Sequence, residues 1–375
     1  MNTPQAPLRY DPSMEHLEED EAETTNELVE TLLKISETVR QDEGHAFRSV
    51  HAKSHGLIVG ELQVLEGLPE TLAQGVFAQG GRYPVVMRVS TIAGDLLDDA
   101  VSLPRGLAIK IVGVEGERLP ESEGDVTQDF LMVNGPVFSV PTARKFLKTL
   151  KLVAATTDKV PGLKKALSAA LRGLESLIEK AGGQSGTLIA LGGQPATNPL
   201  GDTYFTQVPM RHGPYMAKLS LAPVSPELMA LTDAPVDLSD RPNALREEVV
   251  EHFRTHGGTW ELRAQLCTDL DAMPIEDASV QWPEDQSPYV AVARIVARPQ
   301  SAWSPARSAA VDDGMSFSPW HGLAAHRPIG SIMRVRQAAY AMAARYRAQH
   351  NGVRISEPTG LDAIELAEGA APPQA

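Results

Sequence analysis

The sequence predicts an α+β fold in which short antiparallel strands form a barrel or a sandwich flanked by helices. Three observations lead to this prediction. Several runs between residues 56 and 297 alternate apolar with polar side chains, and turn-forming residues separate the runs. Residues 25–40 instead repeat their apolar side chains at helical spacing, and a last helix over 331–350 ends at Asn351-Gly352. Many short strands joined by turns are typical of an antiparallel barrel or sandwich.

The alternation places the clearest strands in chain order. They are predicted at residues 84–90, 107–112, 215–221, 260–268 and 288–297. In the first of them, Arg88 and Ser90 stand two residues apart and therefore share one face. A buried arginine needs an anionic partner, so we expect Arg88 to have one. A further short apolar strand ends immediately before Asn134.

The helices divide the chain into segments. They are predicted at residues 25–40, 142–181, 243–255 and 331–350, with a break in the second near Pro161-Gly162. We divide the chain into an N-terminal arm and helix (1–44), a barrel domain with helical insertions (45–298), a wrapping connection with the last helix (299–355) and a disordered tail (356–375). The tail is rich in proline, alanine and glutamate, a composition that favours fraying.

Composition narrows the range of partners. The chain of 375 residues carries a formal net charge of −14, which disfavours nucleic acid and anionic membranes. Its single cysteine, Cys267, excludes an intrachain disulfide and fits a reducing compartment. No apolar stretch approaches the roughly 18 residues that a membrane span requires. We therefore expect a cytoplasmic protein without stable membrane insertion.

The last predicted helix contains the sharpest chemical pattern. Arg336, Tyr340, Ala343 and Arg347 fall on one stripe of that helix. An arginine one turn before a tyrosine favours the phenolate, because an opposite charge lowers the pKa of the phenol. A tyrosinate is a hard anionic ligand suited to ferric iron. The alternative is a surface helix whose arginines are solvated and whose tyrosine packs.

Two further motifs carry polar groups suited to peroxide chemistry. His51 follows Arg48-Ser49-Val50 just before the first strand, where an imidazole can move a proton between two oxygens. Asn134 begins an Asn-Gly-Pro turn, where its amide can hold a peroxide by hydrogen bonds. The alternatives are a structural histidine, one of ten in the chain, and a turn that serves only the backbone.

Taken together and in this order, the motifs resemble those of the haem catalases over roughly residues 45–350. The matching segments are Arg48-Ser49-Val50-His51-Ala52-Lys53, Met87-Arg88-Val89-Ser90-Thr91, Pro104-Arg105-Gly106-Leu107-Ala108-Ile109-Lys110, Asn134-Gly135-Pro136-Val137-Phe138, and Arg336 with Tyr340. The resemblance implies a closed antiparallel β-barrel with flanking helices. It also implies a haem b that lies between the barrel wall and the last helix, which supplies the tyrosine ligand.

The same resemblance implies a role for each matching residue. His51 is the distal acid/base, Ser90 hydrogen-bonds to it, and Asn134 orients peroxide. Tyr340 is the axial ligand of the iron, assisted by Arg336, while Arg48, Arg88 and Arg347 hold the propionates. The complete set of implied cofactor contacts other than the iron ligand is Arg48, Val50, Arg88, Phe138, Arg336 and Arg347.

The sequence departs from the large catalases at several places. Leu103 stands where the family has an aspartate before Pro-Arg-Gly, and Ser54 replaces a glycine after the His-Ala-Lys run. The short chain resembles the catalase-related branch that includes relatives of coral allene oxide synthase. In those relatives a threonine precedes the distal histidine, whereas Val50 stands there in this chain, as in true catalases.

The resemblance therefore predicts a haem-dependent oxidoreductase that disproportionates hydrogen peroxide or uses it to oxidise small organic electron donors. It also predicts a homo-oligomer, in the manner of the family. One alternative is an enzyme that transforms an organic hydroperoxide of a fatty acid, as allene oxide synthase does. Another is a haem-binding protein without catalysis. A third is a zinc site at His252 and His256, which stand four residues apart but lack an evident third ligand.

Overall fold

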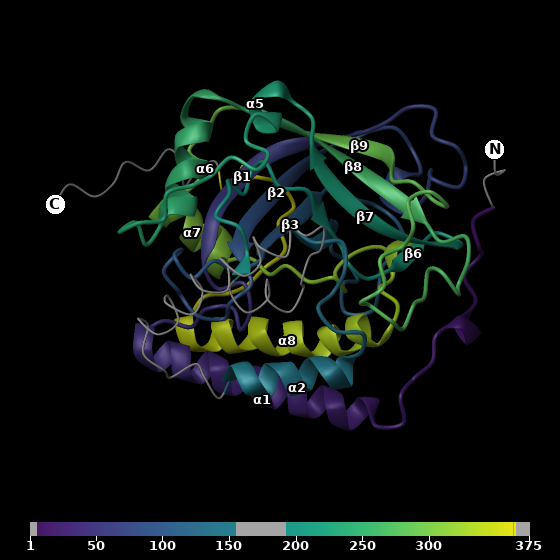
Figure 1. The fold of residues 1–375 in the computed structure, drawn as a ribbon, viewed down its shortest axis with the longest axis horizontal. Coiled ribbons are helices and arrows are strands. Elements are labelled where there is room, and N and C mark those ends of the chain that lie inside the picture. Colours follow the sequence, from purple (N-terminus) through teal and green to yellow (C-terminus); the bar gives the residue numbers. More distant parts are fainter. Residues whose placement is uncertain (1–5, 155–192, 363, 365–375) are drawn as a thin grey trace.

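The core of the molecule is a closed antiparallel barrel (Figure 1). The computed structural model describes residues 6–154, 193–362 and 364. Their strands are β1 (Ser54–Val64), β2 (Arg82–Thr91), β3 (Arg105–Val112), β4 (Thr127–Val133), β5 (Tyr204–Phe205), β6 (Met210–His212), β7 (Tyr215–Pro223), β8 (Gly258–Leu266) and β9 (Val290–Ala297). The strands pair in the order β5-β4-β3-β2-β1-β9-β8-β7-β6, and β5 also pairs with β7. This last pairing closes eight strands into a barrel and leaves β6 outside the ring, so the closed barrel that the resemblance implied is confirmed.

Strand β2 shows how the sequence separates the inside of the barrel from the outside. Val85, Met87 and Val89 are fully buried in the main apolar core. Arg88 and Ser90 therefore point to the outer face, because side chains alternate along a strand. In the paired register, Ser90 lies opposite Gly106 on β3 and opposite Ser54 on β1.

Three helices form a layer along one side of the barrel (Figure 1). They are α1 (Glu21–Glu43), α2 (Ala143–Ala154) and α8 (Ser331–Asn351), and α8 lies nearest to the barrel. The apolar stripe of α1, which includes Leu28 and Leu32, is buried against Leu147 of α2 and Tyr346 of α8. Gly44 ends α1 in the left-handed region at φ 71°, which a glycine adopts without strain.

The remaining helical elements are short or lie on other faces of the barrel. They are α5 (Pro226–Met229), α6 (Ala244–Thr255), α7 (Pro305–Ser308), the 3₁₀ turns Pro12–Met14, Gly75–Phe77 and Ala324–His326, and a π turn, Ala309–Asp313. The helix predicted over 142–181 is described only as α2, and residues 155–181 lie outside the described residues.

The described part of the C-terminal segment packs against the barrel. Glu357 accepts a hydrogen bond at 2.5 Å from Lys110 on β3, and Lys110 also donates to Asp129 on β4 at 2.7 Å. Ile364 is fully buried beside Leu57 and Val86. Residues 356–362, which the sequence placed in a disordered tail, are therefore tied to the barrel by a buried ion pair and by apolar contacts.

Candidate active site

His51 lies on the outer face of the barrel, just before β1. Its Nδ1 is 3.0 Å from Oγ of Ser90, so the hydrogen bond implied by the resemblance is present. A Cβ atom at Gly106 would lie 2.3 Å from Cε1 of His51, and only glycine leaves room for the ring. The backbone of His51 is in the left-handed region at φ 56°, a conformation that costs free energy in residues other than glycine. The structure thus holds one ring nitrogen and directs the other, Nε2, which has no hydrogen-bond partner among the described residues, toward the site.

The surroundings of His51 keep its imidazole neutral. The side chain is partly accessible, yet burial of the ring lowers its pKa, and the positive charges of Arg88 and Arg336 lower it further, to about 3. A neutral imidazole with a free Nε2 can accept a proton from a ligand and return it. The effect of Arg336 also indicates that α8, which carries this arginine, lies near the histidine.

This shift sets an expected pH dependence. A step that needs neutral His51 should proceed at a constant rate from about pH 5 to 8 and should fall only as the pH approaches 3. The pKa of His51 in the folded state lies below the usual value of 6.5, so the unfolded chain binds a proton more readily than the folded protein does. The free energy of unfolding therefore decreases progressively as the pH falls from 6.5 toward 3. Stopped-flow measurement of peroxide consumption against pH checks the first point. An inflection between pH 6 and 7 that His51→Gln abolishes would contradict it.

Asn134 is fixed at the end of β4 by its neighbours. Its Oδ1 accepts a hydrogen bond from the backbone N–H of Arg105 at 2.8 Å, and its Nδ2 donates to Oδ2 of Asp202 at 3.0 Å. Asp202 is also paired with the fully buried side chain of Arg105 at 3.3 Å. One N–H of the amide therefore remains for a ligand. The sequence reading missed Asp202, since no motif marks it.

Tyr340 and Arg336 on α8 adopt the predicted arrangement. Nη2 of Arg336 donates to the phenol oxygen of Tyr340 at 2.8 Å, so the hydrogen bond expected from their spacing is confirmed. Tyr340 is half-buried and packs, together with Val50, against the apolar cluster of α1, α2 and α8. The tyrosine and Val50, the neighbour of His51, thus pack against the same apolar cluster.

The three arginines expected to hold propionates all donate hydrogen bonds to one residue, Asp312 of the π turn. Nε of Arg88 donates to Oδ1 of Asp312 at 2.7 Å, which gives Arg88 the anionic partner that its buried position requires. Nη1 of Arg48 donates to the same oxygen at 3.2 Å. Nη1 of Arg347 donates to the backbone oxygen of Asp312 at 2.6 Å. The sequence reading did not identify Asp312.

The charges in this cluster do not balance. Burial would raise the pKa of Asp312, but Arg88 and Arg48 outweigh that effect and hold it at about 2, so its carboxylate is negative. Burial and the other arginines lower the pKa of Arg48 well below its usual value, and the pKa of Arg347 falls to about 10. Among the described residues, the buried Nε of Arg347 has no partner. The carboxylates of Asp312 and Asp313 offset only part of the charge of the three guanidinium groups, so the cluster fits a further anionic group such as a haem propionate.

The apolar members of the predicted site lie around the start of α8. The ring of Phe138 packs edge-on against Phe146 with 5.2 Å between the centroids. Both rings contact the cluster that contains Ile332 and Met333. The site contains a phenol paired with a guanidinium, a neutral imidazole, apolar rings and surplus arginines. Together these groups form a donor set that fits a haem.

The zinc alternative gains no third ligand in the structure. Nε2 of His252 bonds to the backbone oxygen of Gly257 at 3.0 Å, and the ring of His256 stacks on it. The described parts of the chain contain no group of three or more histidine, cysteine, aspartate or glutamate side chains able to hold a metal ion. They also contain no helix that is both long and apolar enough to span a membrane.

Removing the carboxylate at the centre of the arginine cluster should strongly destabilise the protein. Asp312→Asn leaves the buried guanidinium groups of Arg48 and Arg88 without their anion, and the expected loss is about 3–5 kcal/mol of unfolding free energy. Urea denaturation measures it. The comparison variant is Asp313→Asn. Among the described residues Asp313 forms a salt bridge only with the half-exposed His45 and acts on Arg48 and Arg347 at longer range, so its loss should cost less than that of Asp312. Equal losses in the two variants would contradict the assigned role.

Known proteins place this arrangement in a recognised structural class. The molecule is a closed antiparallel barrel with a serine-bound histidine on its outer wall and an arginine-paired tyrosine on a helix that covers one side. A bacterial catalase matches it with a TM-score of 0.59 and 18% identity, over 83% of this chain and 60% of that one. Catalase A from Saccharomyces cerevisiae matches with a TM-score of 0.58 and 20% identity, over 92% and 68%. A fungal catalase matches with a TM-score of 0.58 and 20% identity, over 95% and 70%. The chain therefore has the catalase fold.

Sequence comparison adds a match to part of the chain. No protein-family model matches the chain. Linolenate 9R-lipoxygenase from Nostoc sp. is 34% identical over 104 residues, which are 28% of this chain and 13% of that protein. The chain thus corresponds to only a small part of that relative. The predicted resemblance to catalases is confirmed in the fold.

Proposed function

We propose that the protein is a haem-dependent oxidoreductase that processes hydrogen peroxide, either by disproportionation or by oxidising small organic donors. The observation that carries this proposal is the presence of two hydrogen-bonded pairs of the kind that peroxide chemistry at a haem needs. Tyr340 accepts a hydrogen bond from Arg336, and the neutral ring of His51 is held by Ser90. A haem-binding protein without catalysis needs the first pair but has no use for the second.

The residues that would hold the cofactor follow from their chemistry. Tyr340 would be the axial ligand of haem b, Arg48, Arg88 and Arg347 would bind its propionates, and Phe138 would pack against it. Arg336 stabilises the phenolate by its hydrogen bond to the phenol oxygen. When bound, the haem supplies the electrons that cleave the O–O bond of the peroxide.

On the distal side, the chain itself positions peroxide and moves a proton. Nε2 of His51 accepts a proton from one peroxide oxygen and delivers it to the other, which leaves as water. Ser90 Oγ fixes the ring for both transfers. The remaining N–H of Asn134 donates to peroxide, and the hydrogen bonds of this amide to Arg105 and Asp202 keep it in place. Val50 has no hydroxyl that would compete for peroxide.

An absorption spectrum tests the proposal directly. The purified protein is reconstituted with haem b and its spectrum recorded before and after addition of hydrogen peroxide. We expect the charge-transfer bands of a ferric tyrosinate, followed by a rapid spectral change and release of oxygen. Binding of haem without these bands would contradict the assignment of Tyr340 as the iron ligand. A ferric tyrosinate spectrum that does not change after addition of hydrogen peroxide, with no release of oxygen, would contradict the proposed enzymatic activity.

A second candidate function is the transformation of a fatty-acid hydroperoxide. The partial match to a lipoxygenase named for linolenate, a fatty acid, favours it. Comparing turnover of hydrogen peroxide with that of a linolenate hydroperoxide by the same preparation separates the two. Faster turnover of the lipid substrate, without release of oxygen, would favour the second function.

Two substitutions should move oxygen release in opposite directions. Val50→Thr places a hydroxyl beside His51, so oxygen release should fall more than donor oxidation does. Leu103→Asp supplies a carboxylate before the Pro104-Arg105-Gly106 segment and should raise oxygen release by drawing peroxide in. Oxygen evolution and donor oxidation are measured side by side in the parent and both variants. A proportional change of both activities in either variant would contradict the expected separation.

A further inference from the structure

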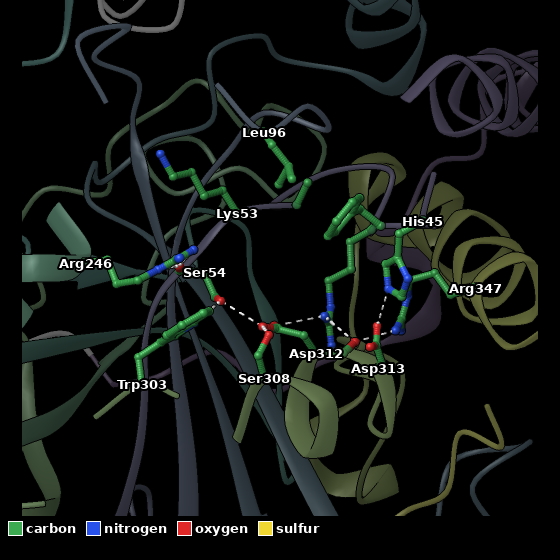
Figure 2. A pocket seen from close by; sticks show the side chains of 13 residues that line it. His45, Lys53, Ser54, Leu96, Arg246, Trp303, Ser308, Asp312, Asp313 and Arg347 are labelled. Atoms are coloured by element: carbon green, nitrogen blue, oxygen red, sulfur yellow. Dashed lines mark hydrogen bonds and ion pairs between the residues drawn. The ribbon is translucent and has the colours of Figure 1, made fainter. Parts of the chain in front are cut away.

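A cavity of about 230 Å³ lies beside the arginine cluster, on the outer side of Asp312 (Figure 2). Arg246 and Trp303 lie on one side of it in this view, and His45 and Arg347 lie on the opposite side. Asp312 belongs both to the wall of this cavity and to the arginine cluster. Ligand pockets for drug-sized molecules span roughly 300–1,000 Å³, so this cavity suits a smaller molecule with a single ring.

The cation that this cavity offers to a ligand is Arg246 of α6. Its guanidinium carbon lies 3.9 Å from the centroid of the Trp303 ring, a close cation–π contact. Nε and Nη2 of Arg246 both donate to the backbone oxygen of Ser54, at 3.0 and 2.9 Å. Among the described residues, Arg246 has no carboxylate partner and Nη1 has no acceptor. The carboxylates of Asp312 and Asp99 act on this charge only at longer range, so the cavity presents one oriented guanidinium that no carboxylate of the described residues contacts directly.

Most other charged groups that line the cavity have partners within the protein, and Arg48 and Arg347 belong to the arginine cluster described above. Lys53 donates to Asp99 at 2.7 Å, while Asp312 is shared by the arginine cluster. Phe47, Leu96 and the ring of Trp303 provide apolar wall. A ligand that complements this lining has one negative charge, which pairs with Arg246, and a small planar apolar body.

A chain of hydrogen bonds links the cavity to the proposed haem seat. Nε1 of Trp303 donates to Oγ of Ser54 at 3.0 Å, and this hydroxyl donates to Oδ2 of Asp312 at 2.8 Å. The other carboxylate oxygen of Asp312 accepts from Arg88. A molecule seated against Trp303 would thus lie next to the edge of the haem at which the propionates bind.

We propose that this cavity binds a small aromatic carboxylate, and, resting on the proposed function, that such molecules are the electron donors of the enzyme. For a phenolic carboxylate the reaction balances as follows. Two donor molecules each lose one electron and one proton from the phenol O–H, and one hydrogen peroxide is reduced to two water molecules. The carboxylate is not changed and serves only to hold the donor at Arg246.

The binding test uses 4-hydroxybenzoate as the probe and 4-hydroxybenzyl alcohol, which has the same ring without the charge, as its matched control. Calorimetry and tryptophan fluorescence follow titration of the haem-loaded protein. We expect the acid to bind at least roughly tenfold more tightly than the alcohol and to quench the fluorescence of Trp303. Trp303→Phe should remove that quenching. Equal affinity for acid and alcohol would overturn the proposal, and this comparison requires no variant to fold.

Substitutions locate the binding site. Arg246→Gln should weaken binding of the acid at least roughly tenfold and leave binding of the alcohol unchanged. Arg254→Gln, on the same helix but exposed and paired with Glu251, is the control and should leave both unchanged. Unaltered affinity in Arg246→Gln would overturn the assignment. Binding to haem-free protein that disappears on loading with haem would also overturn it, because the cavity would then be part of the haem seat.

A final measurement separates this inference from the proposed function. The spectral change caused by hydrogen peroxide alone should be the same in Arg246→Gln and the parent, while KM for 4-hydroxybenzoate oxidation rises. A parent protein that does not respond to peroxide would refute the proposed function even if the acid binds at Arg246. A parent that responds but oxidises acid and alcohol with equal KM would refute the donor assignment alone.

Discussion

Tyr340→Phe should lose stable binding of haem. The substitution removes the phenol oxygen that would ligate the iron and that now accepts the hydrogen bond from Arg336. The ring itself is kept, so packing against the helical cluster should change little. We expect haem affinity to fall by at least roughly 10²-fold, which is about 2.7 kcal/mol, and the ferric tyrosinate bands to vanish. Haem titration followed by absorption measures both effects.

The control for this prediction is the other tyrosine of the same helix. Tyr346→Phe also removes a phenol oxygen that accepts a hydrogen bond, in this case from Nε of Arg40 on α1 at 3.0 Å. Because that bond lies between α1 and α8, its loss should lower stability slightly and leave the spectrum of the haem unchanged. Retention of ferric tyrosinate bands in Tyr340→Phe would refute the axial assignment.

His51→Ala should lower both oxygen release and donor oxidation by roughly 10²-fold or more. This is the usual scale of effect for removing a positioned acid/base. The reason is that Nε2 of the His51 ring is the atom proposed to carry a proton between the two peroxide oxygens. Haem affinity should be preserved, because the side-chain hydrogen bond of His51 within the described residues is to Ser90 on β2 and not to α8. Peroxide consumption by haem-loaded protein, normalised to haem content, is the measurement.

The comparison variant is His256→Ala, which truncates an exposed histidine at the end of α6. It should have the activity of the parent. Ser90→Ala adds an intermediate case, since the ring of His51 would remain but lose the hydrogen bond that orients it. Oxygen release by His51→Ala at the parental rate would refute the distal half of the proposed mechanism.

The residues that sequence alone could place are those whose relation is local. The hydrogen bond between Arg336 and Tyr340 follows from their spacing of four on one helix, and the outward face of Arg88 and Ser90 follows from the period of a strand. The pairing of His51 with Ser90 spans 39 residues and came from the family resemblance, which supplied the tertiary relation that periodicity lacks.

The residues that sequence alone could not place are partners that the tertiary fold brings together. Arg88 was expected to need an anion, but its partner Asp312 lies 224 residues further along the chain. Asp202 lies 68 residues from Asn134. The two-residue strand β5 is too short for a visible alternation, although its pairings with β4 and β7 close the barrel. These three relations depend on the positions of the residues in the folded chain, which no local sequence pattern encodes.

Closure of the barrel also determines how copies of this chain can associate. A sheet with a free edge can recruit a strand from another molecule through backbone hydrogen bonds, whereas the eight strands of the ring have none to offer. The outer edge of β6 is covered as well, since Arg211 donates its backbone N–H to Arg327 at 2.8 Å and Met210 bridges to Pro328. Within the described residues, assembly through this sheet must therefore proceed by contacts between side chains. Such interfaces are specified by surface shape and charge, and they protect the folded protein from the open-ended stacking that leads to fibrils.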